Sequence, residues 1–182
     1  MNRRIPWHRG TGAPKVMALA VLLLTALPPY RLTAQDVGLA LGSVPPAATV
    51  QDMQGQAVDL AATFVGKRPV IVEFWATWCP ICAALLPRME AAQRRYGAQV
   101  EFVVVGVGVN ETRASMQRHI ERHPMPFTFY FDNAGAAVRA FQAPSTSYIV
   151  GLDGAGKVRY TGLGDKQTVE VAVQKSGGRI GG

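Results

Sequence analysis

The chain is poor in cysteine: only two occur among its 182 residues, and both lie in the segment Cys79-Pro80-Ile81-Cys82. Exported proteins commonly use cysteines in structural disulfides, but a bridge between these two positions closes a loop of only a few residues. Because the stabilisation from a disulfide grows with loop length, a purely structural role is a weak interpretation of this pair. No cysteine accompanies the apolar N-terminal stretch, which excludes a lipoprotein anchor.

The N-terminal part also lacks an apolar run of full membrane-spanning length. Val16 to Leu27 is a stretch of 12 residues in which only Thr25 is polar, whereas a transmembrane helix needs about 20. Basic residues precede this stretch (Arg3, Arg4, Arg9 and Lys15), and Pro28-Pro29 follows it. This pattern is typical of a signal peptide. We therefore expect residues 1–34 to be a signal peptide or, if retained, a membrane anchor, and the protein to act in the periplasm or otherwise outside the cytoplasm.

A large excess of charge is missing as well, although the formal net charge is +7. Five of the 19 basic residues lie in the N-terminal segment, whereas all 12 acidic residues follow it, which leaves 14 basic residues and a net charge of +2 in the remainder. No basic run with interleaved aromatic residues occurs. The composition therefore argues against a nucleic-acid partner.

The residues after position 34 suffice for one domain with a substantial core. Pro69 to Trp75 is an apolar, β-branched run, typical of a central strand buried on both faces. The pattern around it predicts strands at 49–52, 57–60, 100–109, 127–131, 145–150 and 157–161, and helices at 80–96, 112–122, 134–141 and from Asp165 to about 174. This alternation predicts an α/β fold, a central mixed sheet flanked by helices on both faces, at residues 35–175. We expect a flexible, glycine-rich tail at 176–182.

The C-x-x-C segment has the features of a reactive dithiol. Pro80 fits the first turn of a helix, where its missing N–H costs nothing, so that Cys79 becomes the N-cap residue. The free amides and the positive end of the helix dipole favour the thiolate of Cys79. Cys82 lies almost one turn further and should be more buried. We therefore expect Cys79 to attack a disulfide and Cys82 to resolve the resulting mixed disulfide.

Metal binding is the alternative chemistry for this pair. A structural zinc site needs about four ligands, and His119 and His123 are the only histidines outside the N-terminal segment. Nothing in the sequence requires them to approach the cysteines, and we expect both to be solvated helix residues. Two thiolates alone suit Cu(I), so a Cu(I) carrier remains an alternative function. We expect no resident metal and no organic cofactor.

Glu73 is the sole charged residue in the run Val70-Ile71-Val72-Glu73-Phe74-Trp75. Strand alternation places it on one face of the strand with Ile71 and Trp75. Burial of a carboxyl group raises its pKa unless a partner compensates. Beside a dithiol, such a group can accept a proton from Cys82 as the mixed disulfide resolves and return it later. An edge-facing or solvent-paired glutamate is the alternative.

Together these residues resemble the thioredoxin superfamily. Phe74-Trp75-Ala76-Thr77-Trp78-Cys79-Pro80-Ile81-Cys82 looks most like the exported TlpA-like branch, which includes the thiol reductases of cytochrome c maturation. Glu73 stands six residues before the first cysteine, where thioredoxins carry a buried acid. Pro87 stands where a proline kinks the first helix of that family. The chain departs from some cytochrome-maturation reductases at Leu85, where they carry a glutamate.

Ala143-Pro144, followed by the segment from Ser145 to Val150, is similar to the cis-proline loop of that family. The resemblance implies a cis Ala143–Pro144 bond, with Pro144 facing the disulfide and the backbone of Ala143 pairing with bound substrate. Trp78 would shield Cys79 and offer an apolar contact to partners. We accordingly assign substrate contacts to Trp78, Pro80, Ala143 and Pro144.

The sequence thus predicts an exported thiol-disulfide oxidoreductase that acts as a protein-disulfide reductase, with Cys79, Cys82 and Glu73 as its catalytic residues. Its partners would be protein thiols and disulfides, and the resemblance implies re-reduction by a membrane thiol transporter. A thiol oxidase would use the same residues in reverse. The direction depends on the reduction potential, where 30 mV corresponds to about 1.4 kcal/mol for two electrons, and the sequence leaves it open.

Overall fold

The computed structural model describes residues 37–64 and 66–179. The segment expected to be a signal peptide or anchor, residues 1–34, lies outside the described residues, as do residues 180–182 of the expected tail. The described residues form seven strands and four helices, in the order β1 (Thr49–Asp52), β2 (Ala57–Asp59), β3 (Val70–Trp75), α1 (Pro80–Tyr96), β4 (Glu101–Val107), α2 (Arg113–Arg122), β5 (Thr128–Asp132), α3 (Ala136–Ala140), β6 (Tyr148–Leu152), β7 (Val158–Leu163) and α4 (Val169–Ser176).

All seven strands belong to one mixed sheet, in the order β2-β1-β5-β4-β3-β6-β7. The three strands β3, β4 and β5 are parallel, whereas the pairs β1–β2, β1–β5, β3–β6 and β6–β7 are antiparallel. The strand β3 lies between β4 and β6, and every residue in it is buried. This explains why its sequence is almost uninterrupted apolar: both of its faces are covered.

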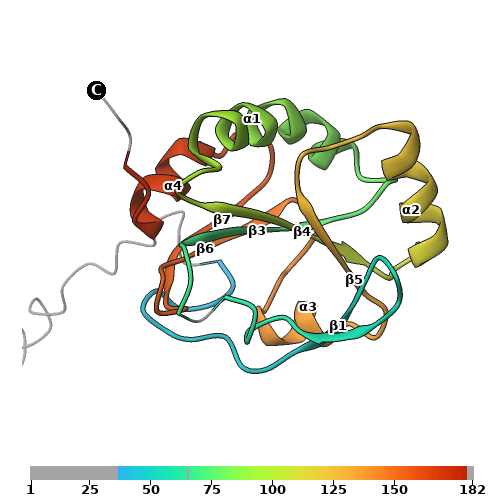
Figure 1. The fold of residues 1–182 in the computed structure, drawn as a ribbon, viewed down its shortest axis with the longest axis horizontal. Coiled ribbons are helices and arrows are strands. Elements are labelled where there is room, and N and C mark those ends of the chain that lie inside the picture. The colour runs from blue at the N-terminus through green and yellow to red at the C-terminus, as the bar shows by residue number, and fades with distance from the viewer. Residues whose placement is uncertain (1–36, 65, 180–182) are drawn as a thin grey trace, which may run out of the picture. The chain divides into compact units, whose positions relative to one another are not determined.

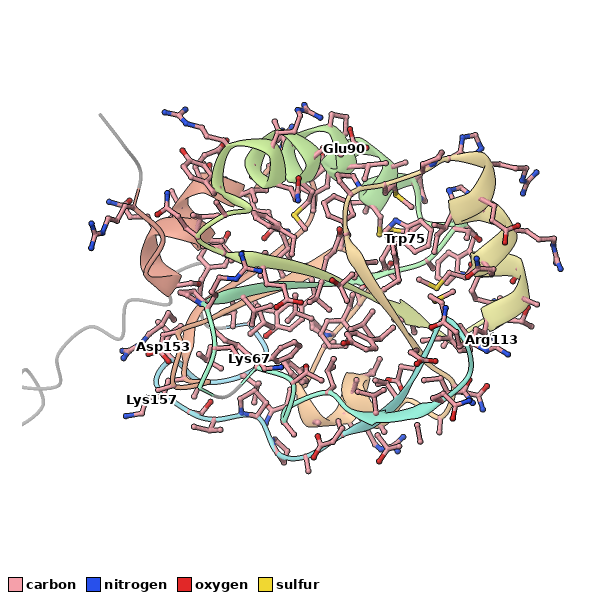
Figure 2. The ribbon with its side chains drawn as sticks, viewed as in Figure 1. Lys67, Trp75, Glu90, Arg113, Asp153 and Lys157 are labelled. Carbon is pink, nitrogen blue, oxygen red and sulfur yellow. A yellow bond between two sulfur atoms is a disulfide. The ribbon has the colours of Figure 1, made fainter. Side chains whose placement is uncertain are left out.

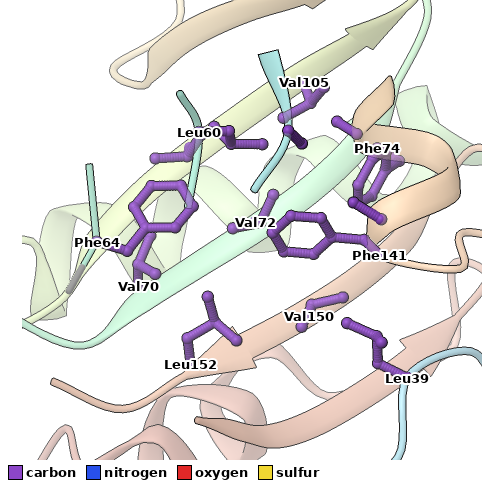
Figure 3. Packing of buried hydrophobic residues seen from close by; sticks show 14 of the residues in the cluster. Leu39, Leu60, Phe64, Val70, Val72, Phe74, Val105, Phe141, Val150 and Leu152 are labelled. Atoms are coloured by element: carbon purple, nitrogen blue, oxygen red, sulfur yellow. The ribbon is translucent and has the colours of Figure 1, made fainter. Parts of the chain in front are cut away.

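Helices cover both faces of the sheet, with α1 and α4 on one side and α3 on the other (Figure 1). Alternate residues of β3 point to opposite sides. Val70, Val72 and Phe74 pack with Phe141 in the core on the α3 side (Figure 3). Ile71 packs with residues of α1 and α4. The α/β class, the mixed sheet and the helices on both faces are therefore as the sequence predicted.

Several boundaries also match the prediction. The helix α1 spans Pro80–Tyr96, the predicted range, and β1 and β2, close to the predicted ranges, form an antiparallel hairpin. The helix α2 begins after Thr112, which is its N-cap and forms a capping box with Ser115. In the loop before it, Asn110 adopts a left-handed conformation, with φ of 51°.

Three predicted boundaries in the C-terminal half are wrong. β6 begins at Tyr148 rather than at 145, because Ser147 is left-handed, with φ of 61°, and cannot continue a strand. α4 begins at Val169, with Thr168 as its N-cap, rather than directly after Asp165. Ser176 belongs to α4 and not to a tail: it is 1% exposed, and its hydroxyl donates to the carbonyl of Ala172.

Within the described part of the chain, no helix has both the length and the apolar character that a membrane span requires.

Candidate active site

Cys79 and Cys82 lie at the N-terminus of α1 and form a disulfide, with their Cα atoms 5.3 Å apart. Cys79 is the N-cap residue and Pro80 occupies the first turn, as the sequence predicted. The backbone N–H of Cys82 donates to Sγ of Cys79 at 3.1 Å. A sulfur that already accepts an amide hydrogen bond at a helix N-terminus is well placed to carry negative charge after reduction.

The two cysteines differ in accessibility. Cys79 is 5% exposed and Cys82 is completely buried, so the expected order of burial is correct. Both pack in one apolar cluster with Trp75 of β3, Val104 of β4 and Met116 of α2. Trp75, labelled in Figure 2, lies on the sheet face that α1 covers. An incoming sulfur therefore reaches Cys79 before Cys82.

Glu73 lies on the same face of β3 as Trp75 and is 1% exposed. Its neighbours on the adjacent strands are Val104 of β4 and Ile149 of β6. Val104 packs in the cluster that contains both cysteines, and Ile149 packs in the cluster that contains Leu85, one turn after Cys82. The carboxyl group of Glu73 is therefore buried beneath the first turns of α1.

The burial of Glu73 is uncompensated. Among the described residues, its Oε1 has no hydrogen-bond partner. Burial raises the pKa of this carboxyl group from 4.5 to about 8, because its charged form loses hydration and Oε1 gains no hydrogen bond from the described residues in return. Glu73 is thus protonated at neutral pH, yet its pKa is close enough to neutrality for the group to accept and return a proton. The edge-facing or solvent-paired alternative is excluded.

Glu111, which no motif in the sequence marks as functional, is a second carboxyl group near the redox pair. It is 9% exposed. Its Oε2 accepts hydrogen bonds from the backbone N–H of Thr77, at 3.0 Å, and from the Thr77 hydroxyl. Its Oε1 accepts from the hydroxyl of Ser115 and from the N–H of Thr112 at 3.4 Å. Glu111 therefore ties the loop before Cys79 to the start of α2.

These donors determine the protonation state of Glu111. Desolvation raises the pKa of its carboxyl group, but the hydrogen bonds from Ser115, Thr77 and Thr112 outweigh it and lower the pKa below 4.5. The sequence carried one signal for this group, a glutamate directly before a Thr-based helix cap, but it does not reveal that Thr77 lies opposite. That proximity arises from the parallel pairing of β3 with β4.

Trp78, Ala143 and Pro144, three of the four residues assigned to substrate contact, line one groove of about 260 Å³. The rest of its lining is formed by Val107, Val109, Val138, Ser145 and Thr146. Trp78 is 47% exposed, and its indole Nε1 donates to the carbonyl of Val109 at 2.9 Å. The fourth residue, Pro80, is exposed at the start of α1 and does not line the groove.

The expected cis bond between Ala143 and Pro144 is wrong, because the described residues contain no cis peptide bond. The loop reverses direction by other means: Gln142 and Ser147 are left-handed, with φ of 48° and 61°. The trans isomer is favoured for X–Pro bonds unless the surroundings require otherwise. The N–H of Ala143 donates to the carbonyl of Val138 at 2.9 Å, so it is not free for the expected backbone pairing with a substrate.

The two histidines of α2 differ from each other. His123 is exposed, as expected, but His119 is half-buried, with its ring edge-on to Trp75 at 5.4 Å and 4.9 Å from the ring of His123. Desolvation, His123 and Arg122 together lower the pKa of His119. In the described part of the chain, no group of three or more His, Cys, Asp or Glu side chains is arranged to hold a metal ion.

The site therefore combines a disulfide at a helix N-terminus, a buried proton-bearing carboxyl group beneath it and an apolar groove beside it. Such an arrangement can exchange disulfides by thiolate attack, with the helix N-terminus favouring the attacking thiolate and the carboxyl group carrying a proton.

Comparison with known proteins agrees with this geometry. The Redoxin family model matches residues 40–175. The thiol-disulfide oxidoreductase ResA of Geobacillus kaustophilus is 29% identical over 163 residues, which cover 85% of this chain and 91% of that protein. A thiol:disulfide interchange protein TxlA homolog of Synechocystis is 27% identical over 124 residues, which cover 68% of this chain and 63% of that protein.

Solved structures show the same fold. A protein of Chlorobium tepidum assigned as a thiol:disulfide interchange protein DsbE superposes with a TM-score of 0.65 at 25% identity, covering 76% of this chain and 98% of that one. The thioredoxin domain of a thiol-disulfide oxidoreductase from Bacteroides vulgatus gives a TM-score of 0.61 at 23% identity, covering 73% and 97%. The chain therefore belongs to the Redoxin family and is a TlpA-like thiol-disulfide oxidoreductase of the thioredoxin superfamily.

Proposed function

We propose that this oxidoreductase acts outside the cytoplasm as a protein-disulfide reductase, through the pair Cys79 and Cys82. The observation that carries the proposal is the position of Cys79 at the N-cap of α1, where its sulfur accepts the N–H of Cys82, beside an open apolar groove. The pattern of residues 1–34 supports export.

In the proposed reaction, the reduced enzyme enters with a thiolate at Cys79 and a thiol at Cys82. The thiolate attacks one sulfur of the substrate disulfide, the substrate S–S bond breaks, and one substrate thiolate leaves. Cys82 then loses its proton and attacks Sγ of Cys79, which releases the second substrate thiolate and forms the Cys79–Cys82 disulfide. The substrate gains two electrons, which the enzyme dithiol supplies.

Glu73 is the proposed proton carrier in the second step. Cys82 is completely buried, so its proton needs a nearby acceptor rather than bulk water. Glu73 lies beneath the same turn of α1, and its pKa of about 8 lets it exchange protons near neutral pH. The ionised fraction of Glu73, a minority at neutral pH, accepts the proton of Cys82, and the carboxylic acid that forms gives this proton to the substrate thiolate that leaves.

The groove is the proposed docking surface for the polypeptide around the substrate disulfide. Trp78, Ala143 and Pro144 contribute apolar surface to it, and Ile81, next to Cys79, is 49% exposed. Burial of apolar substrate side chains on this surface brings the disulfide to Cys79. Because the reaction leaves the enzyme oxidised, a membrane thiol transporter is the proposed electron donor.

The reduction potential of the Cys79–Cys82 couple tests the direction of the reaction. We expect equilibration with glutathione, followed by alkylation and mass spectrometry, to give a value near that of thioredoxin, about −270 mV. A value near that of DsbA, about −120 mV, would instead make the protein a thiol oxidase with the same residues.

A trapping experiment tests the roles of the two cysteines. In the Cys82→Ala variant, the substrate protein should remain attached to Cys79 as a mixed disulfide, because the resolving thiol is absent. The Cys79→Ala variant is the matched control and should trap nothing. Equal trapping by the two variants would contradict the assignment of Cys79 as the attacking residue.

Export has a separate test. The full chain is expressed with a C-terminal tag, and the cells are fractionated. A protein recovered outside the cytoplasm with the mass of residues 35–182 plus the tag supports a cleaved signal peptide, and recovery of the uncleaved chain in the membrane fraction supports an anchor. Recovery of the full-length chain in the cytoplasm would refute export.

A further inference from the structure

The loop between α3 and β6 presents Ala143 and Pro144 to the groove, and it ends in a residue held in an unusual conformation. Ser147 is left-handed, with φ of 61°, and is 1% exposed. A non-glycine residue keeps such a conformation only where its surroundings enforce it. The contacts of Ser147 therefore determine how the loop stands against the redox pair.

Both backbone groups of Ser147 are held by other elements. Its N–H donates to the carbonyl of Phe74 in β3 at 2.7 Å, and its carbonyl accepts from the N–H of Gly164 at 3.3 Å. The carbonyl also accepts from Nε2 of Gln167 at 2.9 Å. Gln167 is thus the only side chain among the described residues with a hydrogen bond to the backbone of Ser147.

The amide group of Gln167 is fully engaged. Its Nε2 donates a second hydrogen bond, to the carbonyl of Gly164 at 2.8 Å, and its Oε1 accepts from the hydroxyl of Tyr160 at 3.3 Å. The two carbonyls can only accept, which requires the nitrogen of the amide to face them. Gln167 therefore binds the end of the Pro144 loop to the connection between β7 and α4.

The fold leaves room for this amide group. A Cβ at Gly162 would lie 2.4 Å from Oε1 of Gln167 and 2.5 Å from the hydroxyl of Tyr160, so a larger residue there would displace these two side-chain ends. The same connection is joined to α1, because the Arg88 guanidinium donates to the carbonyl of Asp165. Gln167 thus lies in the connection that Arg88 joins to α1, and it holds the end of the loop that carries Pro144.

We propose that Gln167 is a positioning residue that holds the Pro144 loop for the docking of protein substrates, without taking part in the sulfur chemistry. The inference rests on the proposed function, since it assumes that protein disulfides dock in the groove that this loop lines. None of the hydrogen bonds of Gln167 within the described residues goes to positions 79–82. A small disulfide, which needs only Cys79, should therefore not sense its loss.

The variant Gln167→Glu tests the proposal, because it preserves the shape of the side chain and removes both donors. A carboxylate there faces two carbonyl oxygens and repels them. We expect kcat/KM for reduction of insulin to fall about tenfold, mainly through KM. Turnover of hydroxyethyl disulfide should stay within about twofold of the wild type. Gln174→Glu, at an exposed position of α4, is the control of equal charge and should change neither rate.

A second variant guards against a folding defect in the first. Gly162→Ala displaces the amide of Gln167 without adding charge, and we expect the same selective loss with insulin. Equal losses with both substrates, or no loss with either, in variants with wild-type circular dichroism would overturn the role of Gln167. A wild-type protein that reduces hydroxyethyl disulfide but not insulin would refute the proposed function itself, and the inference with it.

Discussion

Glu73 and Glu111 are both carboxyl groups close to the redox pair, and both are largely withdrawn from solvent, with exposures of 1% and 9%. Their protonation differs. Burial raises the pKa of Glu73 to about 8, whereas hydrogen bonds from Ser115, Thr77 and Thr112 overcome desolvation and lower the pKa of Glu111. At neutral pH, Glu73 is protonated and Glu111 is ionised.

The difference lies in the donors around each group rather than in the degree of burial. Glu73 stands in the middle of a strand, where the backbone N–H groups of its neighbours are used in the sheet, and apolar side chains surround it. Glu111 stands in a loop at the start of α2, where the N–H of Thr112 and two hydroxyl groups are available. The strand interior therefore keeps the carboxyl group of Glu73 protonated, and the helix N-terminus keeps that of Glu111 ionised.

The largest expected effect is on stability at alkaline pH. The folded-state pKa of Glu73 is raised from 4.5 to about 8, so its contribution to stability is complete below pH 4.5 and is lost as the pH rises toward 8. We expect Glu73→Gln to stabilise the oxidised protein at pH 9 by on the order of 4 kcal/mol relative to the wild type. Denaturant unfolding at pH 5, 7 and 9 measures the change.

The pH dependence distinguishes this effect from a general gain in packing. At pH 5, Glu73 is protonated in the folded state, and the pH is only slightly above the unfolded-state pKa of 4.5. Little of the penalty has therefore developed, and the variant should gain little there. A gain in the free energy of unfolding that is constant from pH 5 to 9 would contradict a raised pKa at Glu73.

The second effect is on catalysis. Loss of a general acid–base group typically costs about 10²-fold, and we expect Glu73→Gln to slow resolution of the mixed disulfide by that factor. In the wild type, the resolution rate should rise with pH through the pKa of about 8, and the variant should lack this rise. Rapid quenching with acid and mass spectrometry of the mixed disulfide follow the step. Alkylation of Cys79 is the internal control and should be unaffected; unchanged resolution would remove Glu73 from the mechanism.

Removal of Glu111 should have a smaller effect and the opposite pH dependence. Glu111→Ala leaves the N–H of Thr77 and the hydroxyl groups around it without their acceptor, and we expect a loss of about 2 kcal/mol in the free energy of unfolding at pH 7. The pKa of Glu111 is lowered in the fold, so this contribution is present above pH 4.5 and is lost as the pH falls through the lowered value.

Unfolding of Glu111→Ala at pH 7 and pH 3 measures both features. Glu121→Ala, at an exposed position of α2, is the matched control and should change stability by less than about 0.5 kcal/mol. A loss for Glu111→Ala that is larger at pH 3 than at pH 7 would contradict an ionised, hydrogen-bonded carboxylate.

The smallest expected effect comes from one donor of this group. Thr77→Val removes the hydroxyl bond to Glu111 but keeps the backbone bond, and we expect a loss of about 1 kcal/mol. The pKa of Glu111 should rise, which NMR titration of its side chain detects. Thr128→Val, which removes an exposed hydroxyl bond to Glu101, is the control. Equal losses for the two threonines would show that the partial burial of Glu111 adds nothing.

The sequence located much of the site because its main features are local. The N-cap position of Cys79 follows from Pro80, and the burial of Glu73 follows from the apolar run around it. The roles of Glu111 and Gln167 were not predictable in this way. Each acts on a segment more than 15 residues away, and no periodicity or spacing encodes such a contact.

The boundary errors have the same origin. The predicted limits of α1 are correct, because proline and the apolar period determine them within the helix itself. The start of β6 was misplaced because Ser147 is held left-handed by Phe74, Gly164 and Gln167. The cis isomer expected before Pro144 is likewise wrong. That expectation follows from a family pattern, whereas the contacts of the surrounding loop determine the isomer.

The sequence alone determined the order of strands and helices, the cysteine pair at a helix start and the acidic residue in a buried strand. Each of these depends on neighbouring residues and on the burial of apolar surface. The tertiary structure decided the protonation state of Glu111, the hydrogen bond from Gln167 that holds the backbone of Ser147, and the groove lined by Trp78 and Pro144. Those properties depend on which donors and surfaces meet across the sheet, and the chain acquires them only when its distant segments pack together.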